Sequence, residues 1–421
     1  MTALINPLRA DTFTAKLQAR VKAVIQRALD EKRLVGAVVL VAHKGELVCC
    51  EVMGLADRES QHPMKVDTVF RLASVSKPIV STAALVLVGQ GRLELDTGIE
   101  RWLPEFQPRL ANGRPARITI RHLLSHMTGL GYRFLEASED GPYACAGVSD
   151  GMDSSLISLE ENVRRLAALP LLYEPSTAWG YSLATDVLGA VIEQVHGVPL
   201  DVAVHRLVTG PLGMMDTGFF AHDVQRVAIT YVNDSPQPHR LQEGEVVSPF
   251  EGVVGIQYSP ARIFDSRAFP SGGAGMAGTA IDFLRLLEAL RKGRGVLLPD
   301  ELIAEMSRDQ TQGYELPSAL GFGFGLGLSV LRDPRLAASP ESEGTWRWGG
   351  AYGHSWFVDR AQGLSVVAFT NTLYEGMSGQ FVTDIRDAVY GALAEGGSVH
   401  GTEVIACAED DKVQAAQETE Q

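Results

Sequence analysis

The sequence is short of cysteine, of long apolar runs and of basic residues, and each shortage excludes a class of protein. Its longest apolar run, Ile79 to Val88, is interrupted by Ser81 and Thr82 and is too short to span a bilayer. Against 51 acidic residues stand 37 basic ones, and the net charge of −14 argues against a nucleic acid partner. The cysteines show no metal-ligand spacing, so we expect no metal site and reduced thiols. They are Cys49, Cys50, Cys145 and Cys407.

The start of the chain, MTALINPLRADTFTAKL, shows no basic segment followed by an apolar stretch. We therefore expect no signal peptide, a cytoplasmic location and no membrane partner, and nothing in the sequence indicates a cofactor. The length of 421 residues and the hydrophobic content of 45% predict a globular protein with a sizeable core. Glycine, alanine and acidic residues dominate the end of the chain, so we predict a disordered acidic tail over residues 396–421.

Strand and helix patterns recur at both ends of the chain. Residues 13–33 have apolar positions at helical spacing, and two strand patterns follow around a turn at Lys44-Gly45. Near the other end, a predicted hairpin precedes a closing helix over 381–393. We therefore predict an α+β fold, with one antiparallel sheet built from both chain ends and covered by these helices. The strands are predicted over 36–42, 46–53, 353–358 and 364–370.

The middle of the chain, from about residue 118 to 225, has a mainly helical pattern with long irregular connections. We expect it to form a helical lobe inserted between the two halves of the sheet, with a cleft between lobe and sheet. Residues 1–395 would then be a single domain, followed by the tail.

The most informative residues are Ser74 and Lys77, three positions apart in the segment FRLASVSKP. Residues at this spacing share a face of a helix, and a hydroxyl beside an amine can become an activated nucleophile. Proline is tolerated only in the first turn of a helix, so Pro78 predicts a helix that begins close to Ser74 and runs to about Gly89. The pattern is weak on its own, because many helices contain Ser-x-x-Lys by chance.

Two further elements strengthen this pattern. Tyr181 stands between a loop and a predicted helix, about a hundred residues after Ser74. Near the C-terminus, the segment Trp348-Gly349-Gly350-Ala351 precedes the last strands. Its glycines let a ligand approach the backbone, and an edge strand offers N–H groups to an oxyanion. Taken alone, the tyrosine also fits a packing role and the glycines a plain bend.

In combination, these motifs resemble the serine β-lactamase and penicillin-binding-protein superfamily, most closely its class C β-lactamase-like family VIII carboxylesterases. The resemblance implies a serine β-lactamase-like fold and an acyl-enzyme on Ser74, with Lys77 and Tyr181 sharing the serine proton. It also implies an oxyanion hole made by the backbone N–H groups of Ser74 and Ala351. It covers roughly residues 13–393 and is carried by residues 70–78, 122–130, 175–182, 272–278, 348–350 and 352–356.

Two departures from the lactamase pattern concern the substrate. Lactamases of this family usually carry Lys-Thr-Gly where this chain has Trp348-Gly349-Gly350, and their Tyr-x-Asn is here Tyr181-Ser182-Leu183. The groups that hold the carboxylate and the side chain of the antibiotic are therefore missing. We expect an esterase for short- to medium-chain acyl esters, with weak or no β-lactamase activity. We therefore expect substrate contacts from Trp348, Gly349, Gly350 and Leu183. Further candidates near the substrate are Tyr132, Phe134 and His354, whereas Trp356 fits core packing better.

Several alternatives remain open. The same residues could serve an acyltransferase, a β-lactamase or D-amino-peptidase-like amidase, or a penicillin-recognising binding protein without turnover. A second serine motif, Gly147-Val148-Ser149-Asp150-Gly151, matches the nucleophile elbow of α/β-hydrolases but lacks the preceding strand. His122 and His126 could share a helix face, but no third metal ligand is indicated, so we expect structural histidines. The sequence does not indicate an oligomeric state.

Overall fold

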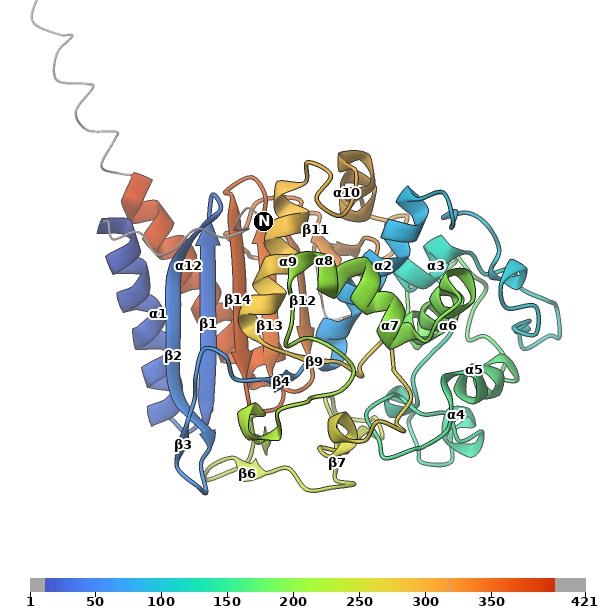
Figure 1. Ribbon diagram of the computed structural model, residues 1–421, viewed down its shortest axis with the longest axis horizontal. Helices are drawn as coiled ribbons and strands as arrows, with labels where there is room; N and C mark the ends of the chain where they lie inside the picture. The colour runs from blue at the N-terminus through green and yellow to red at the C-terminus, as the bar shows by residue number, and fades with distance from the viewer. Residues whose placement is uncertain (1–11, 318, 398–421) are drawn as a thin grey trace, which may run out of the picture.

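The structure is a computed structural model that describes residues 12–317 and 319–397 (Figure 1). Its centre is an eight-stranded sheet with the order β10-β11-β12-β13-β14-β1-β2-β3, in which all neighbours are antiparallel. The strands come from both ends of the chain, which confirms the predicted sheet. They are β1 (Gly36–His43), β2 (Glu46–Asp57), β3 (His62–Pro63), β10 (Phe322–Phe324), β11 (Ser329–Leu331), β12 (Trp346–Gly350), β13 (His354–Asp359) and β14 (Leu364–Thr370).

Strand β1 lies inside the sheet, between β2 and β14, and its sequence GAVVLVAH is almost entirely apolar. Successive side chains of a strand point to opposite faces, so its residues divide between two cores. Val38 and Leu40 join the core shared with the helical lobe, whereas Val39 and Val41 pack beneath the terminal helices. A sheet that is apolar on both faces must be covered on both, which explains the layered fold.

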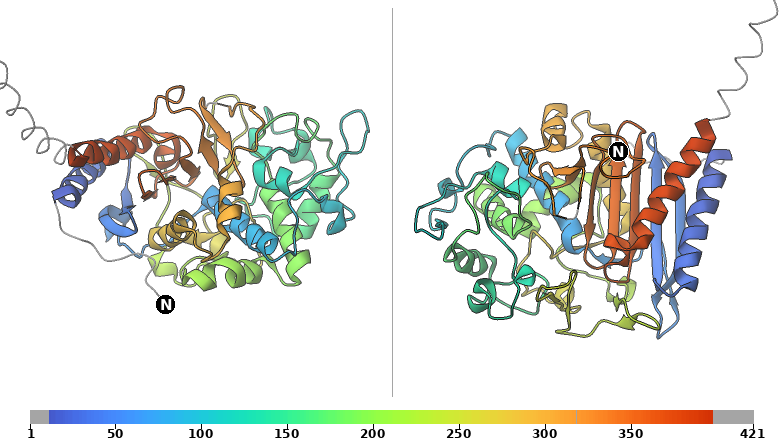
Figure 2. Two further views of the ribbon diagram at one scale, coloured as in Figure 1. Left: turned by 90° about the horizontal axis from the view of Figure 1, so that it is seen from above. Right: turned by 180° about the vertical axis from the view of Figure 1, so that it is seen from behind.

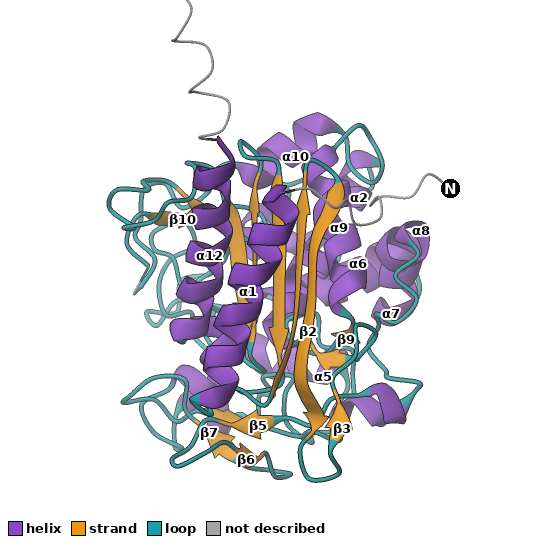
Figure 3. Ribbon diagram, turned by 90° about the vertical axis from the view of Figure 1, so that its left-hand side faces the viewer, coloured by secondary structure: helices purple, strands orange, loops and turns teal. Residues whose placement is uncertain are grey.

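Helices α1 (Thr12–Asp30) and α12 (Gln380–Gly397) cover one face of the sheet and lie side by side (Figure 3). The apolar stripe of α1, with Leu17 and Ile25 fully buried, packs onto this face. Both terminal helices are therefore confirmed. Helix α12 extends slightly past the predicted end of the domain, and the rest of the predicted tail, residues 398–421, lies outside the described residues.

The middle of the chain forms a helical lobe on the other side of the sheet from α1 and α12 (Figure 2). Helix α2 (Ser76–Gly89) runs between the sheet and the other helices and is buried over nearly its whole length. Helix α9 (Ala280–Lys292) packs against β1 and β14. The remaining helices are α3 (Ile120–Ser125), α4 (Pro142–Cys145), α5 (Leu159–Ala167), α6 (Ala184–His196), α7 (Leu200–Val204), α8 (Gly210–Leu212), α10 (Asp300–Ser307) and α11 (Glu375–Ser378).

Three short two-stranded ribbons connect these layers. Pairing of β4 with β9 matters most for the site, because it joins the residues before Ser74 to the glycine-rich turn at 272–276. The sequence did not predict the ribbons or β10 and β11, since strands of two or three residues are too short to show a period. The ribbon strands are β4 (Phe70–Arg71), β9 (Ala277–Gly278), β5 (Tyr231–Val232), β6 (His239–Arg240), β7 (Val246–Val247) and β8 (Ile256–Gln257).

The described part of the chain bears on two features of the sequence, its lack of a long apolar run and its few cysteines. No single described helix is both long and apolar enough to cross a membrane. The pair Ala184–His196 and Leu200–Leu212 reaches the necessary length and composition only when taken together, and it is bent by 79°. Cys49, Cys50 and Cys145 carry free thiols, and Cys407 lies outside the described residues.

Candidate active site

Ser74 lies in a single 3-10 turn, Ala73–Val75, that leads directly into α2. The helix proper begins at Ser76, two residues after the predicted start, and ends at Gly89 as predicted. Ala73 has a φ of +46°, a left-handed value that is unfavourable for a residue with a Cβ. The neighbours of Ser74 in the turn are buried, whereas its own side chain keeps partial exposure. A strained turn therefore presents this hydroxyl.

Hydrogen bonds on both sides of the chain hold this turn in place. Leu72 N–H donates to Met276 O at 2.8 Å, next to the β4–β9 ribbon. The Nε2–H of His354 donates to Arg71 O at 2.8 Å. Because the surrounding structure fixes the residues before Ala73, the left-handed backbone can persist.

The structure brings Ser74, Lys77 and Tyr181 together. Ser74 Oγ lies 2.5 Å from Tyr181 Oη, a short hydrogen bond in which either oxygen can be the donor. Lys77 Nζ donates to Ser74 Oγ at 3.3 Å and to Gly273 O at 2.8 Å. One face of the α2 start therefore carries the hydroxyl and the amine, as their spacing predicted, and the tyrosine meets them from the helical lobe.

Ser74, Lys77 and Tyr181 are called the trio below. Lys77 is its most deeply buried member, with 1% of its surface exposed. Its Nζ lies 4.6 Å from the ring centre of Tyr181 and 5.4 Å from that of Tyr132. Aromatic faces at such distances stabilise an ammonium group, as does the carbonyl of Gly273. The amine is thus held by the residues that surround the serine rather than by water.

Tyr181 is positioned by the end of α3. His126, the residue that follows this helix, lies 5.0 Å from the Tyr181 ring between ring centres, and its Nδ1 is 3.2 Å from Ser182 Oγ. Its carbonyl accepts a hydrogen bond from Gly180 N–H at 3.1 Å. Burial and the charge of Lys77 hold the pKa of His126 well below its usual value, so the ring is neutral. His126 therefore supports the tyrosine, in line with the structural role expected from the sequence.

The end of β12 approaches the Ser74 turn closely, and its glycines make this possible. A Cβ at Gly350 would lie 2.4 Å from Leu72 O, and one at Gly349 would lie 2.8 Å from His354 O. No side chain fits at either position without displacing backbone. Ala351 follows directly and is 6% exposed. The backbone after β12 therefore runs beside the Ser74 turn.

Aromatic rings flank the trio on two sides. On one side, the Tyr132 ring lies 5.0 Å from that of Tyr181 and 4.6 Å from that of Phe134. On the other side, half-buried Trp348 lies 5.4 Å from Tyr181 and 5.1 Å from Phe324. Most of the side-chain surface around Tyr181 is therefore aromatic.

Three sequence candidates lie behind the site rather than in it. Leu183 is fully buried in the main core at the start of α6, so it presents no surface to a substrate. His354 is 1% exposed and holds the Ser74 turn through Arg71 O, while burial lowers the pKa of its ring to about 4. Trp356 is 1% exposed and packs against Phe283, which agrees with the core-packing role expected from the sequence.

The second serine motif does not form a nucleophile elbow. Residues 147–151 form a loop, with no strand before them and no helix directly after. Ser149 is buried, donates to Asp153 Oδ1 at 2.9 Å and accepts from Gly151 N–H at 3.1 Å. Its hydroxyl therefore serves the loop itself.

The histidine pair does not form a metal site. His122 Nε2 lies 2.8 Å from Ser176 Oγ, and its Nδ1 accepts from Thr119 N–H at 3.3 Å. Both ring nitrogens are thus engaged within the helical lobe. Among the described residues, no group of three or more His, Cys, Asp and Glu side chains could hold a metal ion.

The sequence analysis assigned no role to two residues that lie beside Lys77, namely Asp186 and Gly273. Asp186, in the first turn of α6, is 1% exposed, and Ser271 Oγ donates to its Oδ1 at 2.6 Å. In the sequence, Asp186 could be noticed only as an acidic residue among the apolar residues of α6. Acidic residues are common in the first turn of helices, so this position did not stand out. Gly273, which accepts the hydrogen bond from Lys77, lies in a turn whose role the sequence did not reveal.

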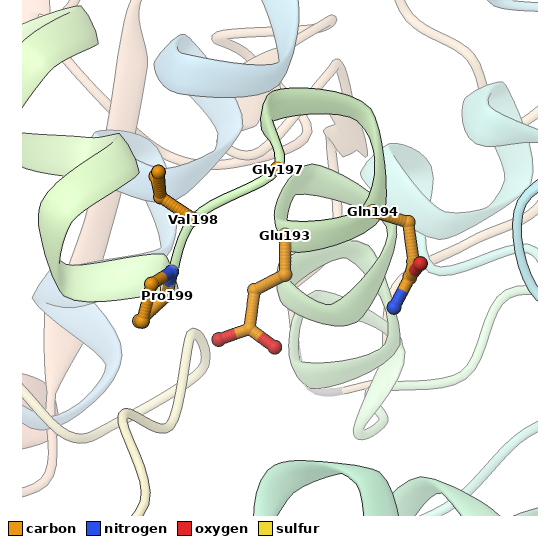
Figure 4. A pocket seen from close by; sticks show the side chains of 5 residues that line it. All are labelled: Glu193, Gln194, Gly197, Val198 and Pro199. Atoms are coloured by element: carbon orange, nitrogen blue, oxygen red, sulfur yellow. The ribbon is translucent and has the colours of Figure 1, made fainter.

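A shallow hollow lies at the other end of α6, lined by Glu193, Gln194, Gly197, Val198 and Pro199 (Figure 4). The carboxylate of Glu193 accepts from Leu200 N–H at 2.8 Å, and burial raises its pKa. It therefore joins α6 to α7. None of the residues of the trio lines this hollow.

Comparison with known proteins places this geometry in context. The chain is 50% identical over 389 residues to Esterase EstB of Burkholderia gladioli, covering 92% of this chain and 99% of that protein. It superposes with a TM-score of 0.87 on "EstCE1, a hydrolase with promiscuous acyltransferase activity", at 46% identity, covering 90% of this chain and all of that one.

A more distant structure shares the fold alone. The simvastatin synthase LovD of Aspergillus terreus superposes with a TM-score of 0.71 at 21% identity, covering 92% of this chain and 100% of that one. The sequence model described as Beta-lactamase matches residues 21–390, nearly the whole described part of the chain. The protein therefore belongs to the β-lactamase family and has the serine β-lactamase-like fold.

Proposed function

We propose that this protein is a serine carboxylesterase of the family VIII type, which cleaves short- to medium-chain esters through an acyl-enzyme on Ser74. The observation that carries the proposal is the placement of Tyr181 Oη and Lys77 Nζ at 2.5 and 3.3 Å from Ser74 Oγ. A hydroxyl with proton acceptors at these distances is suited to nucleophilic attack. The 50% identity with a known esterase supports the same activity.

In the first half-reaction, Ser74 Oγ attacks the carbonyl carbon of the ester and transfers its proton to the Tyr181–Lys77 pair. The Tyr181–Lys77 pair lacks one proton before the attack. Tyr181 Oη is the nearer acceptor, so we assign it the Ser74 proton, and after the transfer the pair consists of a neutral phenol and a Lys77 ammonium group. The bond between the carbonyl carbon and the alcohol oxygen then breaks, and the pair returns the proton to the leaving alkoxide. In the Ser-x-x-Lys motif, Ser74 thus supplies the nucleophile and Lys77 the group that carries the positive charge.

The oxyanion of the tetrahedral intermediate needs donors on the opposite side of the carbonyl. We assign this role to the backbone N–H groups of Ser74 and Ala351. The close packing of Gly350 on Leu72 O supports the assignment, because it keeps the end of β12 beside the Ser74 turn. One such donor typically contributes about 3 kcal/mol to transition-state stabilisation.

In the second half-reaction, water attacks the acyl carbon and gives a proton to the same pair. The bond between the acyl carbon and Ser74 Oγ then breaks, the pair returns the proton to Oγ, and the acid leaves. An alcohol in place of water would give acyl transfer, and the promiscuous acyltransferase activity of EstCE1 favours this as the second candidate function. Product analysis in the presence of added alcohols separates the two, since only transfer gives a new ester.

The substrate class follows from what surrounds the trio. Trp348 occupies the position where lactamases carry lysine, and the aromatic rings of Tyr132 and Phe134 face it across Tyr181. Apolar walls favour neutral acyl groups, and the missing cation removes the partner of an antibiotic carboxylate. We therefore propose small neutral esters as substrates, bound beside Trp348, Gly349 and Gly350.

The substrate assignment predicts a clear order of rates. Purified protein should cleave p-nitrophenyl butyrate at least about a hundredfold faster, in kcat/KM, than any penicillin, because only the penicillin must leave its carboxylate unpaired. Initial rates with both substrates at one pH measure the ratio. A penicillin cleaved faster than the butyrate ester would contradict the proposal.

The remaining properties extend the same proposal. We infer that residues 1–395 form one catalytic domain and residues 396–421 an acidic tail. The reaction written above requires no cofactor and no metal, and its partner is a small-molecule ester rather than a nucleic acid or a membrane. The free thiols of the described cysteines fit a reducing, cytoplasmic location.

A further inference from the structure

A buried carboxylate lies close to Lys77, outside the trio described above. Asp186 is 1% exposed, and its Oδ1 accepts a hydrogen bond from Ser271 Oγ at 2.6 Å. Its Oδ2 is buried without a well-formed hydrogen bond among the described residues. A carboxylate oxygen in this state is costly unless a charge nearby compensates it.

Gly273 occupies the space between this carboxylate and the amine. A Cβ at Gly273 would lie 2.6 Å from Asp186 Oδ2 and 3.4 Å from Lys77 Nζ. The two groups thus converge on one point, and only a residue without a side chain fits there. They act on each other across Gly273, whose carbonyl accepts from the same amine at 2.8 Å.

Two cations, Lys77 and Arg262, act on Asp186. Burial raises the pKa of Asp186 to about 6, while the Ser271 hydrogen bond, the charges of Lys77 and Arg262 and the backbone N–H of Gly273 act against this rise. The Arg262 guanidinium donates to backbone carbonyls, among them Phe269 O at 2.9 Å. The facing hydroxyl of Tyr132 is neutral, because burial holds its pKa well above the usual value.

We propose that Asp186 is a positioning residue whose carboxylate supplies the counter-charge to Lys77 across Gly273, and thereby sets the pH at which the Tyr181–Lys77 pair accepts the Ser74 proton. The inference rests on the proposed function and deepens it. A fixed negative charge stabilises the cation that forms when the proton reaches the pair. The effect is strong here because both groups are shielded from water.

The test is the pH profile of kcat/KM for p-nitrophenyl butyrate in Asp186→Asn. Without the negative charge the protonated pair is less stable, so the acid limb should move to lower pH by about one unit or more. Glu193→Gln is the matched control, because it removes a half-buried carboxylate from the other end of the same helix, α6, and leaves Asp186 with its Ser271 hydrogen bond. Its limb should stay at the wild-type position.

An unmoved limb in Asp186→Asn, or an equal displacement in Glu193→Gln, would overturn the proposal. If Asp186→Asn does not fold, thermal unfolding in a Lys77→Met background decides. There the Asp186 carboxylate lacks its counter-charge, so Lys77→Met/Asp186→Asn should have a higher Tm than Lys77→Met.

A double variant that is less stable than Lys77→Met, or that does not fold, assigns Asp186 to the fold alone and also overturns the proposal. Failure of the proposed function gives a different result, namely esterase activity that survives in Ser74→Ala. The two failures are therefore distinguished in the same assay.

Discussion

The hydroxyl of Tyr181 is the nearest proton acceptor to Ser74, and its ring is fixed from two sides. His126 lies 5.0 Å away and Trp348 5.4 Å away between ring centres. Such packing leaves the phenol little freedom to leave the 2.5 Å contact with Ser74 Oγ. A catalytic group held in this way acts without the entropic cost of finding its position.

Replacement of Tyr181 by phenylalanine should keep the ring in place and remove the proton acceptor. We expect kcat for p-nitrophenyl butyrate to fall about 10²- to 10⁴-fold, with a small change in Tm. Steady-state kinetics and thermal unfolding measure the two effects. Tyr314→Phe, at an exposed site, is the control. A loss of activity below tenfold would show that Lys77 takes the proton unaided.

The sequence predicted that Ser74, Lys77 and Tyr181 lie together, because the family's motifs contain them, and the structure brings the three side chains into contact. Asp186 was missed, since its contact with Ser271 joins residues 85 positions apart and arises only from the packing of α6 on the glycine turn. Leu183 shows the opposite error. Its place in a motif suggested substrate contact, whereas the start of α6 turns it into the core.

Strand β12 reaches the Ser74 turn because its last two residues, Gly349 and Gly350, have no side chains. Gly350 pairs with His354 across the hairpin, and the His354 ring donates to Arg71 O. One short segment therefore connects the C-terminal sheet to the residues just before Ser74. Its placement controls the geometry of the proposed oxyanion hole.

A methyl group at Gly350 should disturb this placement. In Gly350→Ala the new Cβ would meet Leu72 O at 2.4 Å, so strand and turn must move apart. We expect kcat/KM to fall about a hundredfold and stability by about 1–3 kcal/mol. Gly218→Ala is the control, because a Cβ there meets nothing within 4 Å. Near-normal activity in Gly350→Ala would show that β12 does not shape the site.

Elements with a clear period were predictable, and those without one were not. Helix α1 and strands β1 and β14 show apolar positions at the spacing of their structure, and each lies within a few residues of its prediction. Strands β10 and β11 have three residues each and offer no period. The structure forms them because the edge of β12 provides hydrogen bonds to pair with.

At the scale of the whole molecule, the site requires segments from three distant parts of the chain. Ser74 and Lys77 come from the start of α2, Tyr181 from the helical lobe, and Trp348 from the C-terminal half of the sheet. Their contacts span more than a hundred residues. Because the sheet is built from both ends, the placement of Trp348 beside Tyr181 also depends on the pairing of β1 with β14 across the length of the chain.

The identity of the nucleophile is tested most sharply by the stoichiometry and position of covalent labelling by a serine-directed phosphonate, followed by intact mass and peptide mapping. We expect one adduct per chain on the peptide that contains Ser74, unchanged labelling of Ser149→Ala, and none of Ser74→Ala. An adduct on the Ser149 peptide, or a labelled and active Ser74→Ala variant, would show that Ser74 is not the nucleophile.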